Sequence, residues 1–78
     1  MTTFERKVLR AIARMRLPLR DVDILAQSLC VHEHTVLSAI AALEHEDLVM
    51  WRYFNGIRKA GWRPTNHGRH MCEQDLHI

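Results

Sequence analysis

The sequence has 78 residues and a mass of 9.2 kDa, which leaves room for one small domain. Apolar residues make up 47% of it and charged residues 26%, an ordinary globular composition that argues against a disordered chain. Eleven Lys and Arg against nine Asp and Glu give a net charge of only +2, so the total charge does not identify a partner.

The apolar stretches are interrupted by charges well before the roughly 20 residues that a membrane span needs, and the amino terminus lacks a signal-peptide pattern. We therefore expect a cytoplasmic protein. Cys30 and Cys72 are too few for a disulfide scaffold, so two reduced thiols are expected rather than a Cys30–Cys72 bridge.

Apolar residues at helical spacing predict a first helix over residues 3–16, ended by Leu17-Pro18 because proline disfavours helix in the residue before it. The apolar residues of this helix are Phe4, Val8, Ile12 and Met15. The opposite arc carries four cations: Arg6, Lys7, Arg10 and Arg14. That arc is either a solvated surface or a face for phosphate or an acidic partner.

Two further helices are predicted, separated by a tight turn at Cys30-Val31-His32. The second, over residues 21–29, begins where Asp21 and Asp23 supply the carboxylates that a helix start favours. The third runs over residues 33–47, and its buried stripe is Val36, Ala39, Ile40 and Leu43.

A β-hairpin follows, because residues 48–54 are rich in aromatic and branched side chains and Asn55-Gly56 is a strong turn signal. Its second strand is expected over residues 60–64, with Pro64 at the strand end. Thr65 is placed to cap a last short helix over residues 66–75. The fold class is therefore α+β.

The stretch Ile24–Val36 resembles the "LA…L…TV" core of MarR-like and related bacterial or phage regulators. The stretch Ile40–Val49 is similar to the "I..LE..GLV" that ends their recognition helix, and Thr65-Asn66-His67-Gly68 matches the "T..G" that closes their wing. The resemblance covers about residues 20–70 and implies a winged helix-turn-helix: three helices, a two-stranded wing and a short last helix.

The resemblance implies binding to double-stranded DNA, with the third helix in the major groove and the wing on the backbone. On the recognition helix it points to His32, Glu33, His34, Thr35, Leu37, Ser38 and Ala41. On the wing it points to Arg52, Asn55, Arg58, Lys59 and Arg63. Wing cations also serve to keep an edge strand from pairing with other chains, so that second reading stays open.

The recognition helix departs from the family because residues 32–47 contain no Lys or Arg, whereas many regulators carry one near Ser38 or Ala41. The leading hypothesis is a small sequence-specific transcriptional regulator, such as a repressor. The alternative is a winged-helix module that binds a protein of the transcription or replication machinery through its first helix or recognition-helix face.

A homodimer is expected, since one recognition helix and wing bury a small interface that two-fold symmetry doubles. The candidate dimer contacts are Met71, Leu76 and Ile78 in the tail, or Leu9 and Leu17 flanking the first helix.

Two clusters contain potential zinc ligands, namely Cys30, His32 and His34, and then His67, His70 and Cys72. Neither has the paired spacing of a zinc finger, so solvated or DNA-contacting histidines are the preferred reading and no metal or other cofactor is predicted. The sequence has no phosphate loop, nucleophile elbow or paired-carboxylate pattern, so an enzyme is not expected.

Overall fold

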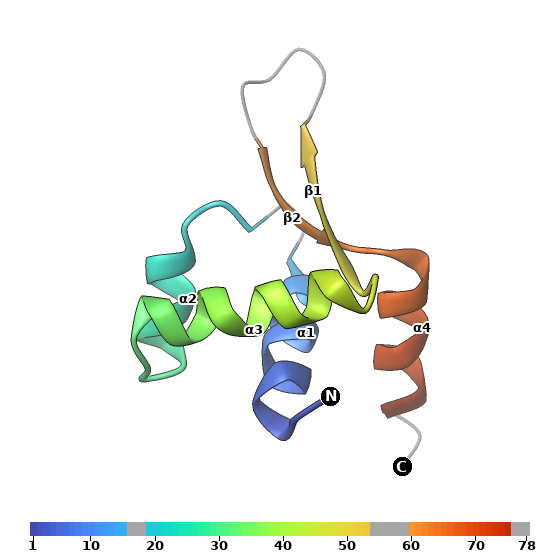
Figure 1. Cartoon of the computed structure of the whole chain (residues 1–78), viewed down its shortest axis with the longest axis horizontal. Coiled ribbons are helices and arrows are strands. Elements are labelled where there is room, and N and C mark those ends of the chain that lie inside the picture. The colour runs from blue at the N-terminus through green and yellow to red at the C-terminus, as the bar shows by residue number, and fades with distance from the viewer. Residues whose placement is uncertain (16–18, 54–59, 76–78) are drawn as a thin grey trace.

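The computed structural model describes residues 1–15, 19–53 and 60–75. Its elements follow in the order α1 (Thr3–Arg14), α2 (Val22–Ser28), α3 (Glu33–His45), β1 (Val49–Tyr53), β2 (Ala60–Pro64) and α4 (Asn66–Asp75). The strands form an antiparallel hairpin that rises from a base of helices, with α1 in the centre and α2 and α4 on opposite flanks (Figure 1). The α+β prediction is confirmed.

Helix α1 begins with a reciprocal cap at Thr2. The Thr2 Oγ1 accepts a hydrogen bond from the Glu5 backbone N–H at 3.1 Å, and the Thr2 N–H donates to Glu5 Oε2 at 3.1 Å. The helix ends at Arg14, two residues before the predicted end, because Met15 is already extended with φ −73° and ψ 135°. This early end lets the chain return along the hairpin: Leu19 forms a β-bridge with Trp62, with both N···O distances at 2.9 Å.

Helices α2 and α3 both end in the same closing motif, which corrects their predicted ends. Cys30 and Asp47 adopt left-handed φ values of 58° and 60°. The next backbone N–H in each case then bonds back across the last turn, from Val31 to the Ala26 carbonyl at 3.0 Å and from Leu48 to the Leu43 carbonyl at 2.9 Å. The predicted end of α3 at residue 47 was therefore two residues too far.

The predicted start of α2 also needs correction, because Asp21 is its N-cap residue but makes no side-chain capping bond. Leu48, predicted as the first residue of a strand, lies before β1 because its N–H closes α3. Phe54, the last residue of that predicted strand, lies outside the described residues. The second strand and the last helix have the predicted bounds.

The core forms where α1, α2, α3 and the hairpin base meet. Its buried residues are Val8, Leu9, Ile12, Leu19, Val22, Leu25, Ala26, Val36, Ala39, Ile40, Leu43, Leu48 and Val49. The predicted stripe of α3 is thus confirmed in full, whereas Phe4 and Met15 of the α1 stripe are only partly buried. Leu9 is 1% exposed, so its prediction as a dimer contact is wrong: α1 packs against α3, α4 and β2, which widens its buried arc.

Candidate nucleic-acid interface

The side of helix α3 that faces away from the core is exposed along the helix. Its buried stripe faces the core, and this leaves the predicted contact residues of the helix and its N-cap exposed: His32, Glu33, His34, Thr35, Leu37, Ser38 and Ala41. Leu37 is 44% exposed, which is high for a large apolar side chain. The structure therefore brings this predicted group together on one helix, ready to meet a partner.

The charge on this helix is negative. Four exposed carboxylates follow His32, namely Glu33, Glu44, Glu46 and Asp47, and no Lys or Arg lies among them. Three of the four lie in or just beyond the last turn, away from the exposed first turns. The amino-terminal half of α3 is therefore polar but nearly neutral, and the carboxyl-terminal end would repel phosphate.

The hairpin separates its arginines from its tryptophans. Met50 pairs with Arg63 and Arg52 pairs with Gly61, and paired residues two apart along a strand share one face of a sheet. That face therefore carries Arg52 and Arg63. The other face carries the Trp51–Trp62 pair, whose ring centroids lie 5.2 Å apart in an edge-to-face arrangement.

Three wing residues predicted from the sequence, Asn55, Arg58 and Lys59, lie outside the described residues.

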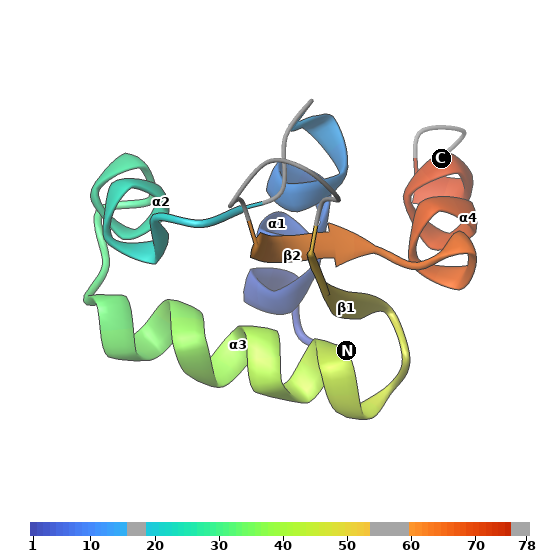
Figure 2. The same ribbon diagram turned by 90° about the horizontal axis from the view of Figure 1, so that it is seen from above.

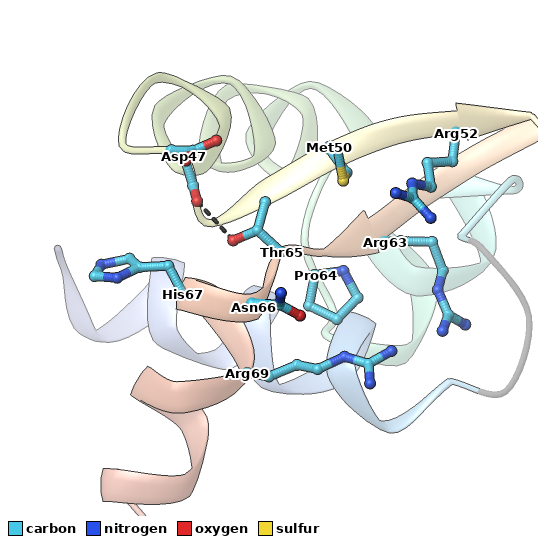
Figure 3. Close-up of a pocket in the computed structure, with 9 residues that line it drawn as sticks. All are labelled: Asp47, Met50, Arg52, Arg63, Pro64, Thr65, Asn66, His67 and Arg69. Carbon is cyan, nitrogen blue, oxygen red and sulfur yellow. Dashed lines mark hydrogen bonds between the residues drawn. The ribbon is translucent and has the colours of Figure 1, made fainter.

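A hollow of about 470 Å³ opens between the arginine face of the hairpin and the start of α4 (Figure 3). Arg52 reaches it from β1, Arg63 from β2 and Arg69 from α4. Asp47 is the one carboxylate among the described residues that line it. The described lining thus places three guanidinium groups around one opening, a composition suited to phosphate or carboxylate groups.

The start of α4 is fixed in this position by Thr65. Its Oγ1 donates to the Asp47 carbonyl at 2.6 Å (Figure 3) and accepts from the Gly68 N–H at 3.0 Å. Its backbone N–H donates to the Leu48 carbonyl at 3.0 Å. The predicted cap is confirmed. Sequence reasoning missed Arg69, because its place beside Arg63 depends on how α4 packs against β2.

Within the described residues, the histidines and cysteines do not assemble into a cluster of metal ligands. Across the described ranges, no three His, Cys, Asp or Glu side chains are placed to hold a metal ion. Cys30 is exposed, Cys72 is half-buried on α4, and no disulfide joins the two.

No helix in the described part of the chain is long and apolar enough to cross a membrane.

Solved structures with the same arrangement of elements decide the fold. FabT of Streptococcus pneumoniae, solved in complex with DNA, superposes with a TM-score of 0.80 at 17% identity over 99% of this chain. The adhesin competence repressor AdcR of Streptococcus pyogenes gives 0.78 at 18% identity over 99%, and the transcriptional regulator SlyA gives 0.79 at 17% over 97%. The protein has a winged helix-turn-helix fold. The predicted resemblance to MarR-like regulators is thereby confirmed for the fold.

In this winged helix, α2 and α3 form the helix-turn-helix, α3 takes the position that the recognition helix has in this fold, and β1 and β2 form the wing. The chain spans about half the length of these structures: 53% of FabT, 55% of AdcR and 53% of SlyA. No family model and no curated protein matches the sequence.

Proposed function

We propose that this winged helix binds double-stranded DNA and acts as a small sequence-specific transcriptional regulator. The proposal is carried by the exposed first half of α3 together with a wing face that holds Arg52 and Arg63. One structure of the same fold was solved in complex with DNA, which supports the same use of the fold here.

The two elements divide the work of binding. The first turns of α3 enter the major groove, where His34 and Ser38 hydrogen-bond to base edges and Leu37 or Ala41 contacts a thymine methyl group. The wing contacts phosphate through Arg52 and Arg63, and we assign the same role to Asn55, Arg58 and Lys59. Because α3 has no guanidinium to read guanine, affinity comes mainly from the wing and sequence preference from neutral side chains.

We also propose that the regulator is a repressor that acts as a homodimer, since two-fold symmetry would double a small DNA footprint. Met71 on α4 is half-buried and remains a candidate contact, while Leu17, Leu76 and Ile78 lie outside the described residues. Sedimentation equilibrium tests the assembly: a mass of twice 9.2 kDa at micromolar concentration supports it, and a monomer at 100 µM contradicts it.

The DNA hypothesis is tested by selecting preferred sites from random duplexes at about 50 mM salt, where the electrostatic contribution to binding is large. The double variant His34→Ala with Ser38→Ala should retain binding to mixed DNA but lose about tenfold in preference for the selected site, or about 1.4 kcal/mol. His45→Ala, an exposed histidine in the last turn of the same helix, is the matched control and should keep that preference. Absence of any binding by the wild-type protein at 50 mM salt refutes the proposal.

A second function is favoured by one observation: α3 exposes Leu37 and lacks cations, as a protein-docking helix would. In that case the chain is an interaction module for a component of the transcription or replication machinery. Leu37→Ala distinguishes the two functions, because it would abolish capture of a protein partner but remove only a thymine-methyl contact from the DNA interface, which leaves wing-led binding to mixed DNA within about threefold of wild type.

A further inference from the structure

A second hollow adjoins the first and extends the arginine surface away from the wing. It measures about 330 Å³ and is lined by Arg10 and Arg14 of α1, Arg63 of β2, and Arg69 and Glu73 of α4, together with Ala13, Met15 and Cys72. Arg63 and Arg69 line both hollows, so the two openings adjoin at these side chains. We call Arg10, Arg14, Arg52, Arg63 and Arg69 the arginine strip.

The strip is strongly positive for so small a protein. Among the described residues that line the two hollows, five are arginines and two are carboxylates, Asp47 and Glu73, so the lining carries an excess of three positive charges. This exceeds the net charge of +2 of the whole chain. Arg14, Arg52 and Arg69 are exposed, so their guanidinium groups are open to a partner from solvent.

The part of the strip on α1 and α4 is separated from most of α3 by the hairpin. Seen from above, α3 runs along one side of the hairpin, while the carboxyl-terminal half of α1 and most of α4 lie on the other side (Figure 2). Glu44 and Glu46 at the end of α3 line neither hollow, whereas Asp47, just beyond α3, lines the first hollow together with Arg69.

The shape and composition of the strip indicate the class of partner. The arginines of the strip are spread over α1, β1, β2 and α4 and line two adjoining openings. A single small anion would need only one pocket into which a few polar groups point. Guanidinium groups bind phosphate through paired N–H donors, and several in a row match a ligand with repeating phosphates. We propose that the arginine strip binds the phosphodiester backbone of DNA and extends the footprint from the wing to α1 and α4. This inference rests on the proposed DNA binding and adds residues that neither α3 nor the wing supplies.

The double variant Arg14→Gln with Arg69→Gln tests the strip, since both side chains are exposed and each loses one positive charge. The matched control is Arg6→Gln with Lys7→Gln, which removes two exposed cations of α1 that line neither hollow. Binding of each protein to a mixed-sequence 20-bp duplex is measured by fluorescence anisotropy between about 50 and 200 mM salt, and thermal melts establish that each variant is folded.

If both arginines contact phosphate, the slope of log K against log salt becomes shallower by about 1.8, and affinity at 0.1 M salt falls about 60-fold. The control should change the slope by less than about 0.5. If the strip variant binds with the slope of the control, the inference is overturned while the proposed DNA binding stands. If the wild-type protein fails to bind any duplex at 50 mM salt, the proposed function fails and the inference fails with it.

Discussion

Gly68 in the first turn of α4 allows a prediction in which two physical effects have opposite signs. A Cβ at this position would overlap the carbonyl oxygen of Leu48 and lie 3.1 Å from its carbonyl carbon. The same oxygen accepts the backbone hydrogen bond from Thr65 at 3.0 Å. Because the obstacle is backbone, it cannot rotate aside, and Gly68→Ala must push α4 away from the start of β1.

Helix propensity alone predicts that Gly68→Ala stabilises the protein by about 1 kcal/mol. The overlap costs about 1–3 kcal/mol, and the weakened Thr65–Leu48 hydrogen bond costs about 1 kcal/mol more. We therefore expect a net loss of about 1–3 kcal/mol. For a chain of this size, a loss of about 2 kcal/mol lowers Tm by roughly 8–16 °C.

Thermal and urea unfolding followed by circular dichroism measure this change. His67→Ala, an exposed neighbour in the same turn, is the control and should stay within about 0.5 kcal/mol of wild type. A Gly68→Ala protein more stable than wild type would show that propensity outweighs the contact and would refute the reasoning.

Two further predictions concern Cys30, which has a left-handed φ, and Leu9, which lies in the core rather than at a dimer contact. Cys30→Gly should raise the free energy of unfolding by about 1 kcal/mol, because a φ of 58° costs an ordinary L-residue about 1–2 kcal/mol. The control Ser28→Gly, in α2, should instead lower the free energy of unfolding by about 0.5–1 kcal/mol. Urea midpoints of the two variants that move in the same direction would contradict this. Leu9→Ala should cost about 2–5 kcal/mol because the side chain is 1% exposed, and Leu37→Ala, at 44% exposure, should cost less than about 1 kcal/mol. A Leu9→Ala protein of wild-type stability would rule out its place in the core.

The fold could be predicted because most of its signals are local. The stripe of α3 depends on spacings of a few residues, and Thr65 caps α4 as its position suggests. Helix ends were less predictable. Asp47 and Cys30 take the left-handed conformation usually left to glycine, so neither residue type marks a stop.

The candidate site could be predicted only in part. The exposed residues of α3 follow from helical periodicity, but the arginine strip joins α1, β1, β2 and α4, which are far apart in the sequence. Arg69 has no sequence pattern that distinguishes it from a solvated cation. Leu19 was also missed, because a single-residue bridge to Trp62 is too short to produce a periodic signal.

The separation of charge between α3 and the arginine strip gives the molecule an electric dipole, which sets how it turns as it diffuses. Glu33, Glu44 and Glu46 lie on or just beyond α3 and mark the negative pole. Arg10, Arg14 and Arg69 lie on α1 and α4 and mark the positive pole, since the carboxyl-terminal half of α1 and most of α4 lie on the other side of the hairpin from α3 (Figure 2). In the field of a polyanion, such a molecule rotates before contact so that its arginines lead, although its net charge is only +2. The first collisions with DNA would then be made by the strip, and α3 would reach the bases only after the protein has already been captured.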